Sequence, residues 1–204
     1  MAIYFVRHGK DEDGFRGGWS ERGLIEVGIQ QSKKLAEYLK ENKENFKISR
    51  IITSDLRRAL ETSQYIGESL KLTIEQSKDW RETNNGILAG MRNEEANQKY
   101  PGLYFNSLKM DERYPGGESP IENFTRIKRA FEGICREQME RNYQENVLIV
   151  THGGVINIIY HILKSIEWTN KNKPFPSSNT SIHKIEYVND NWEITQENLM
   201  LHLK

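Results

Sequence analysis

The sequence has little of the chemistry that would point to disulfides, nucleic acid or a membrane. Its 204 residues include one cysteine, Cys135, which excludes a disulfide within the chain, and none of the usual metal-ligand spacings occurs. Lys and Arg number 29, as do Asp and Glu, so no net charge attracts the chain to nucleic acid or to acidic lipid. No apolar run approaches bilayer length, and the first residues lack the basic and apolar regions of a secretory signal. We therefore expect a cytoplasmic protein with no nucleic-acid or membrane partner, and its oligomeric state stays open.

Strand and helix patterns alternate along the chain, which favours a layered α/β fold. Apolar, β-branched runs predict strands at 2–6, 48–53, 72–75 and 147–150, and a closing hairpin at 182–188 and 192–195. Amphipathic patterns predict helices at about 23–42, 56–70, 120–143 and 155–163. Ser54 and Asp55 are typical N-cap residues for the second of these helices. The length suits a single domain, residues 1–204, in which Cys135 occupies a structural position.

The periodic patterns break down between about 86 and 119, where Gly, Pro, Tyr and charged residues mix. Long irregular stretches inside compact domains are usually functional, so we predict a flap packed over the site. Two alternatives stay open for its aromatic residues, which either receive an apolar part of a substrate or pack the flap down. These residues are Tyr100, Tyr104, Phe105 and Tyr114. Arg92 and Arg113 are candidates for reading a second anionic group, or are ordinary exposed arginines.

The first predicted strand ends on a cation, an imidazole and a glycine, Arg7-His8-Gly9. Open α/β sheets bind their ligands at the carboxyl ends of strands, and glycine allows a sharp turn and a close approach of a ligand. We interpret His8 as a nucleophile that attacks phosphorus. The alternative is that Arg7 and His8 are merely polar residues of the first loop. Lys10 follows directly and either tunes the rim of the site or is an ordinary exposed lysine.

Three further strand ends carry matching groups. Arg57 and Arg58 follow the second strand, and the position of Arg58 favours the site, whereas Arg57 is expected to face outward. Glu82 follows the short third strand, and His152 precedes Gly153 at a helix start, where free N–H groups favour an anion. If these strands lie side by side, the loops bring two arginines, two histidines and an acid to one rim. Such a set matches a phosphoryl group, because arginine offers paired donors and histidine adds a donor or a nucleophile.

Taken in order, five segments of the chain resemble the histidine phosphatase superfamily, also called the phosphoglycerate mutase-like family. The segments are Arg7-His8-Gly9, Ser54 to Ser63, Glu82 to Gly90, Tyr114 to Ser119 and Val147 to Gly154. The resemblance covers nearly the whole chain and implies a three-layer α/β/α sandwich with a mostly parallel central sheet. It assigns the pocket arginine to Arg58, the proton donor to Glu82 and the second histidine to His152.

The resemblance also implies a two-step phosphoryl transfer. Neutral His8 attacks phosphorus while Glu82 protonates the leaving oxygen, and water activated by Glu82 then cleaves the phosphohistidine. The implied catalytic set is His8, Glu82, Arg7, Arg58 and His152. The implied substrate-binding set is Arg7, Gly9, Lys10, Arg58 and Gly153. Neither a metal nor a cofactor is expected, because the arginines supply the electrostatic stabilisation.

The chain departs from the family pattern after the signature glycine. Many relatives carry Ser or Thr and then Asn there, whereas this loop holds Asp11 and Gly14 and looks shorter. The departure argues against mutase-type recognition of a bisphosphate. We therefore expect a phosphomonoester phosphatase acting on a small phosphorylated substrate of open identity. The alternatives are a phosphoglycerate mutase-type transfer and a non-catalytic phospho-ligand binding module, against which the positioned acid Glu82 argues.

Overall fold

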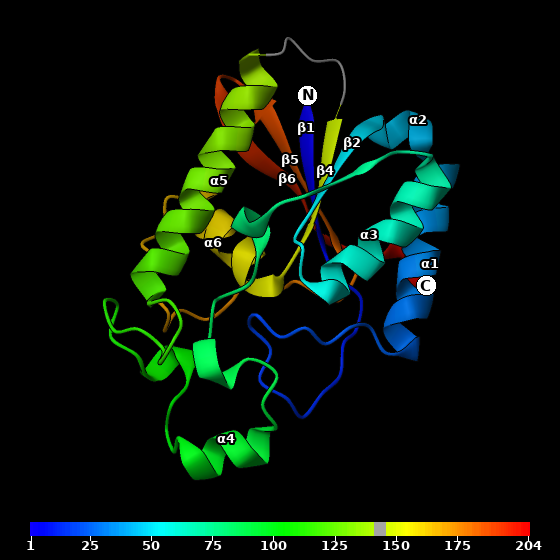
Figure 1. Ribbon diagram of the computed structural model, residues 1–204. Coiled ribbons are helices and arrows are strands. Elements are labelled where there is room, and N and C mark those ends of the chain that lie inside the picture. Colours follow the sequence, from blue (N-terminus) through cyan, green and yellow to red (C-terminus); the bar gives the residue numbers. More distant parts are fainter. Residues whose placement is uncertain (141–145) are drawn as a thin grey trace.

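The computed structural model describes residues 1–140 and 146–204 and is built on a six-stranded mixed sheet (Figure 1). The strands are β1 (Ala2–Arg7), β2 (Ile48–Thr53), β3 (Ile74–Gln76), β4 (Asn146–Thr151), β5 (Ile182–Val188) and β6 (Asn191–Leu199). Their order in the sheet is β3-β2-β4-β1-β5-β6. The first four are mutually parallel, whereas β5 runs antiparallel to β1, and β6 antiparallel to β5. The sheet is therefore parallel where the candidate residues lie.

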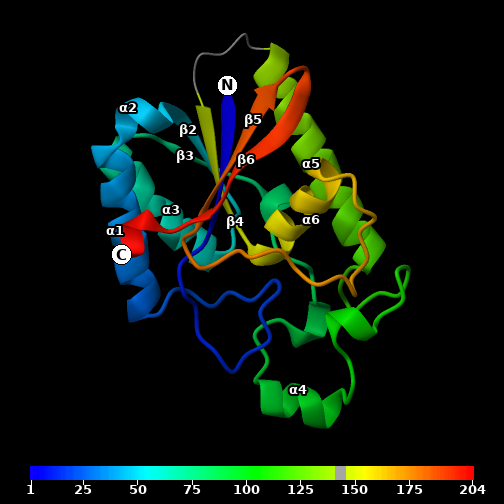
Figure 2. The ribbon, with the colours of Figure 1, turned by 180° about the vertical axis from the view of Figure 1, so that it is seen from behind.

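Helices cover both faces of the sheet, so the fold is a three-layer sandwich (Figures 1 and 2). One face carries α1 and α3, and the other carries α5 and α6. The α-helices are α1 (Glu26–Glu41), α2 (Lys43–Phe46), α3 (Arg57–Leu70), α4 (Asn93–Lys99), α5 (Pro120–Glu140) and α6 (Gly153–Leu163). Short 3₁₀ helices are found at Lys78–Trp80, Gly86–Leu88, Phe105–Ser107 and Leu201–Leu203. Among the helices of the described residues, none has the length and apolar character needed to cross a bilayer.

Strand β1 is buried on both of its faces. Tyr4 and Val6 belong to the core shared with α1 and α3, whereas Ile3 and Phe5 belong to the core shared with α5 and α6. A strand covered on both sides needs a continuous apolar run rather than an alternating one, as the sequence provides. The second core also contains Cys135, where burial raises the pKa of the thiol to about 12. The cysteine therefore stays protonated within the packed interior, as its structural assignment predicts.

Several predicted boundaries are wrong, and one of them changes a residue's role. The strand predicted at 72–75 begins two residues later and ends one residue later, at Ile74–Gln76. Helix α3 begins at Arg57 with Leu56 at the N-cap, rather than after a side-chain cap from Ser54 or Asp55. The Asp55 carboxylate instead accepts two hydrogen bonds, of 2.5 and 2.7 Å, from Arg81. Because of this pairing, Asp55 does not cap the helix. Of the helix predicted at 120–143, residues 141–143 lie outside the described residues.

The segment 86–119 lies beyond the carboxyl ends of the parallel strands, next to the loop that follows β1 (Figure 1). It is less irregular than its sequence indicates, because it contains α4 and a small core of Leu88, Ala96, Leu108 and Tyr114. Backbone hydrogen bonds of 2.8 Å join Arg16 to Met91 and to Gly90. The flap and the first loop therefore form one continuous wall.

Candidate active site

His8 and His152 lie side by side at the carboxyl ends of two neighbouring strands. Strand β1 pairs in parallel with β4, in a register that sets Arg7 opposite Thr151. The backbone N–H of His8 donates to the carbonyl oxygen of Thr151 at 3.0 Å. The two imidazole centroids are 5.1 Å apart, and both side chains are buried. The parallel sheet thus brings together two histidines that are far apart in the sequence.

The hydrogen bonds of His8 fix which of its nitrogens can react. Its Nδ1 lies 2.8 Å from the Gly9 carbonyl oxygen, which only accepts, so Nδ1 carries the proton. The remaining nitrogen, Nε2, receives an N–H from Arg58 Nε at 3.3 Å and therefore presents a lone pair. Burial lowers the pKa of His8 well below its ordinary value, and Arg58 and Arg7 lower it further. The imidazole is neutral at neutral pH, as a nucleophile must be.

Arg58 is locked under this imidazole by the first loop. Its Nη1 donates to the Ser20 carbonyl oxygen at 3.1 Å and its Nη2 to that of Gly18 at 2.8 Å. The carboxylate of Asp11 lies 3.6 Å from its Nε. Only 3% of the Arg58 side chain is exposed, and burial lowers its pKa, against the opposing effect of Asp11. The neighbouring Arg57 is 64% exposed, which confirms that it faces outward.

Two of the predicted catalytic residues have a buried nitrogen atom that lacks a hydrogen-bond partner among the described residues. One is Arg7 Nε, whose guanidinium is held by a 2.6 Å hydrogen bond from Nη1 to the Ser177 carbonyl oxygen. The other is Nδ1 of His152, which is fully buried. Buried donors left unpaired are costly, and an anion that accepts from such a donor removes that cost.

The hydroxyl group of Ser54 lies beside the imidazole of His152. Its oxygen lies 2.8 Å from Nε2 of His152 and accepts the Leu56 N–H at 3.3 Å. If the hydroxyl donates its proton to Nε2, the imidazole proton lies on Nδ1, the nitrogen that lacks a partner. Burial, followed by the charge of Arg58, lowers the pKa of His152 well below its ordinary value. A neutral imidazole with its proton on Nδ1 would offer that N–H to an anion.

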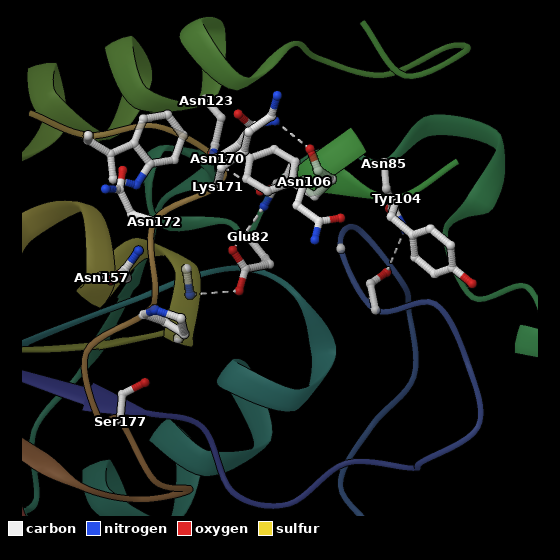
Figure 3. Close-up of a pocket in the computed structure, with 18 of the residues that line it drawn as sticks. Glu82, Asn85, Tyr104, Asn106, Asn123, Asn157, Asn170, Lys171, Asn172 and Ser177 are labelled. Carbon is white, nitrogen blue, oxygen red and sulfur yellow. Dashed lines mark hydrogen bonds between the residues drawn. The ribbon is translucent and has the colours of Figure 1, made fainter. Parts of the chain in front are cut away.

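Backbone N–H groups hold the carboxylate of Glu82 at the start of α6. Its Oε2 accepts from Gly154 and its Oε1 from Thr83, both at 3.1 Å. A Cβ on Gly154 would lie 2.3 Å from the carboxylate, so the glycine is required for this approach. Glu82 borders a cavity (Figure 3), and Arg7 and His8 line the same cavity. The acid therefore borders the same space as Arg7 and His8, and Arg58 joins them at a second, smaller cavity.

Gly9 and Lys10 are not brought to this space, and neither belongs to the lining of the two cavities that contain His8. The Gly9 N–H is donated to Thr62, and a Cβ there would lie 2.5 Å from the Gly28 carbonyl oxygen. The glycine is therefore needed for packing against α1 rather than for the approach of a ligand. The ammonium of Lys10 pairs with Asp13 at 2.5 Å. Gly153 does line the larger cavity.

Two residues that support Glu82 were missed from the sequence. Arg126 on α5 donates to the carbonyl oxygens of residues 79, 81 and 82 and pairs with Glu118 at 2.8 Å. Trp19 donates its indole N–H to the Glu82 carbonyl oxygen at 2.7 Å. Of the two, only Trp19 is conspicuous in the sequence, because it is a large apolar residue at the end of a polar, glycine-rich loop. Arg126 reads as an ordinary polar position of an amphipathic helix.

Two cavities meet at His8, whereas His152 belongs to the lining of neither. The larger has a volume of about 910 Å³ and the smaller about 320 Å³, and both are bordered by Arg7, His8 and Glu82. Of the flap aromatic residues, Tyr104, Phe105 and Tyr114 line the larger cavity, whereas Tyr100 does not. Arg92 and Arg113 lie outside both linings. Within residues 1–140 and 146–204, no three His, Cys, Asp or Glu side chains gather closely enough to hold a metal ion.

Comparison with known proteins gives one consistent result. The sequence model of the histidine phosphatase superfamily (branch 1) matches residues 3–199. "Phosphoglycerate mutase-like protein 4" of Arabidopsis thaliana is 33% identical over 165 residues, which cover 78% of this chain and 69% of that protein. "Uncharacterized phosphatase PhoE" of Bacillus subtilis (strain 168) is 29% identical over 209 residues, covering 99% and 96%. The solved structure of Bacillus stearothermophilus YhfR is similar with a TM-score of 0.82 at 26% identity, covering 100% and 99% of the two chains.

Proposed function

The chain belongs to the histidine phosphatase superfamily (branch 1), and we propose that it is a phosphomonoester phosphatase that forms a phosphohistidine on His8. One observation carries the proposal. A buried, neutral imidazole presents its Nε2 lone pair beside Arg58, and Glu82 borders the same cavity. A module that only binds phosphate needs the cations but has no use for a positioned acid.

In the first step, Nε2 of His8 gives up its hydrogen bond from Arg58, attacks phosphorus and forms the N–P bond as the bond to the ester oxygen breaks. Glu82 gives its proton to that oxygen, so the leaving group departs as a neutral alcohol. The guanidinium groups of Arg7 and Arg58 and the Nδ1–H of His152 hold the remaining phosphoryl oxygens. The unpaired donors of Arg7 and His152 then gain acceptors.

In the second step, water attacks phosphorus from the side that the alcohol has vacated. Glu82, now a carboxylate, takes a proton from the water as the N–P bond breaks. Inorganic phosphate is released, and His8 recovers its lone pair on Nε2. The Gly9 carbonyl oxygen keeps the other proton on Nδ1 throughout, so the same nitrogen is reused.

Asp11 supports hydrolysis over a mutase reaction. A mutase has to bind a product bearing a second anionic group and return the phosphoryl group to it. In this chain a carboxylate lies 3.6 Å from Arg58 and lines the smaller cavity. It competes for the charge of Arg58 and repels a second anion on that side.

Incubation with p-nitrophenyl phosphate and, separately, with 3-phosphoglycerate tests the proposal. We expect turnover of the first, its loss in His8→Ala, and no effect of a metal chelator. Isomerisation of 3-phosphoglycerate at a rate that exceeds hydrolysis would support the mutase. Inertness toward every phosphomonoester would leave only a binding role.

A further inference from the structure

The larger cavity extends well beyond the space needed for a phosphoryl group. About 910 Å³ is near the upper end of the roughly 300–1,000 Å³ typical of small-molecule sites. Its outer part is bordered by the flap residues Tyr104, Phe105 and Asn106, by Asn157 on α6, and by the segments 168–172 and 174–177 that precede β5. We call this part the outer chamber. Glu82 borders the same cavity (Figure 3).

The walls of the outer chamber are fixed to one another. The side-chain N–H groups of Asn170 donate to the carbonyl oxygens of Phe105 at 2.5 Å and Leu108 at 2.9 Å, which ties the segment before β5 to the flap. Trp168 stacks on Phe124 with 5.3 Å between ring centroids and 16° between planes. Both walls are therefore present before any ligand binds, which lowers the entropy cost of binding.

Amide side chains supply the unused hydrogen-bonding groups of the chamber. Asn106 makes no side-chain hydrogen bond among the described residues. Asn157 accepts the Phe175 N–H at 3.1 Å through Oδ1, which leaves its Nδ2 as a donor. Asn172 likewise uses Oδ1 within its own turn, and Asn170 keeps Oδ1 as an acceptor. These side chains surround the hollow that also holds Glu82 (Figure 3). Donors and acceptors in close alternation suit hydroxyl groups, which both give and take a hydrogen bond.

The charges of the chamber give little support to a second anionic group. Beside Arg7, its cations are Arg16 and Lys171. Arg16 donates to Asn97 at 2.7 Å and lies 4.2 Å from the ring centroid of Tyr104. Its buried Nε is an unpaired donor, which a hydroxyl oxygen can satisfy as well as an anion. Lys171 is an exposed residue of the 168–172 segment. The aromatic side chains add apolar surface of the kind on which a sugar ring or a base stacks.

We infer that the outer chamber binds the alcohol part of the substrate, and that this alcohol is uncharged, rich in hydroxyl groups and of sugar or nucleoside size. The inference rests on the proposed phosphatase function and adds a substrate class to it. Asn106 and Asn157 read the hydroxyl groups, the aromatic walls receive the apolar face, and Arg7, Arg58 and His152 hold the phosphoryl group.

A panel of monoesters with alkyl leaving groups tests the inference, and p-nitrophenyl phosphate first establishes that the enzyme is a phosphatase. The panel contains glucose 6-phosphate, adenosine 5′-monophosphate, cyclohexylmethyl phosphate, ethyl phosphate and 3-phosphoglycerate. We expect kcat/KM for glucose 6-phosphate or for adenosine 5′-monophosphate to be at least tenfold higher than for cyclohexylmethyl phosphate, ethyl phosphate or 3-phosphoglycerate. The inference is overturned if kcat/KM for any one of cyclohexylmethyl phosphate, 3-phosphoglycerate and ethyl phosphate equals the values for both hydroxylated esters. Absence of p-nitrophenyl phosphate turnover would instead overturn the proposed function itself.

Two substitutions separate hydroxyl recognition from general damage. Asn106→Ala and Asn157→Ala should each lower the ratio of kcat/KM for the preferred hydroxylated ester to that for cyclohexylmethyl phosphate by about fivefold, the effect of one neutral hydrogen bond. Asn45→Ala, at an exposed asparagine in α2, is the matched control and should leave the ratio unchanged. Asn157→Ala also removes the acceptor of the Phe175 N–H, which could shift the chamber wall. Asn106 makes no side-chain hydrogen bond among the described residues, so Asn106→Ala is free of this side effect. An unchanged ratio in both variants would contradict the inference.

Discussion

Arg58 Nε points its proton at Nε2 of His8 across 3.3 Å, so the guanidinium marks the one nitrogen of the imidazole that keeps a lone pair. Two backbone carbonyl oxygens of the first loop hold the far end of the same guanidinium. The arginine therefore positions His8, the proposed nucleophile. It also places a positive charge beside the phosphoryl group that His8 attacks. This double role makes Arg58 the most sensitive of the cations.

Replacement of Arg58 by alanine should lower kcat/KM for p-nitrophenyl phosphate by about two to three decades, as expected for loss of a charged donor to a transition-state oxygen. Arg57→Ala is the matched control, because the adjacent arginine is exposed and pairs with Glu61 at 2.7 Å. We expect less than a threefold change for this control in steady-state kinetics. Equal losses in the two variants would show that the helix start, rather than the guanidinium of Arg58, is what matters.

Glu82→Gln should impair esters with poor leaving groups most. An alkyl oxygen needs a proton to depart, whereas p-nitrophenolate departs without one. We expect the loss in kcat/KM to be at least tenfold larger for ethyl phosphate than for p-nitrophenyl phosphate. A uniform loss across both esters would indicate that Glu82 supports the fold of the site but does not donate the proton.

Ser54→Ala should lower kcat/KM by about tenfold, because His152 then loses the hydrogen bond that keeps its proton on Nδ1. Ser54→Thr retains a hydroxyl group and should recover most of the activity. Ser63→Ala, at a buried hydroxyl group in α3 that bonds the Leu60 carbonyl oxygen at 2.8 Å, serves as the control. NMR of the His152 ring nitrogens reports the tautomer directly. An unchanged tautomer in Ser54→Ala would remove the role given to the serine.

Stability should fall as the pH drops below about 6.5. Burial lowers the pKa of His183 and of His202 to about 4, and those of His8 and His152 well below 6.5. Between the folded and unfolded pKa values the unfolded chain binds more protons, so acid favours unfolding by up to about 1.4 kcal/mol per pH unit for each histidine. Urea unfolding at several pH values between 7.5 and 4.5 measures the slope.

A variant assigns part of that slope to one side chain. His183 accepts or donates hydrogen bonds with Tyr160 at 2.6 Å and Ser181 at 2.9 Å, away from the proposed chemistry. His183→Gln should reduce the pH dependence of the free energy of unfolding by about one proton between pH 6.5 and 4. A slope identical to that of the wild type would contradict the assignment.

The parts of the site that the sequence predicted are those that lie directly at strand ends. An apolar run buried on both faces identifies β1, and the residues that follow such a strand in an open α/β sheet face its ligand edge. His8 and His152 were therefore predictable, because each follows a run of this kind. Arg58 was separable from Arg57 because only one of two consecutive helical residues faces inward.

The remainder depends on contacts between segments that no local pattern encodes. Ser54 looks like a helix cap in the sequence, yet the pairing of β2 with β4 places its hydroxyl group beside His152. Arg126 supports the Glu82 loop from a helix whose sequence shows only its amphipathic face. The outer chamber was also missed, since the segment before β5 has no periodicity and gains its position through Asn170.

The most direct test of the account is the identity of the phosphorylated residue during turnover. Wild-type protein and Glu82→Gln are mixed with p-nitrophenyl phosphate and quenched in alkali, which preserves phosphohistidine, and the peptides are mapped by mass spectrometry. We predict a phosphoryl group on His8 that accumulates in Glu82→Gln, because the second step lacks its base. Phosphorylation of another residue, or turnover by His8→Ala, would contradict the account.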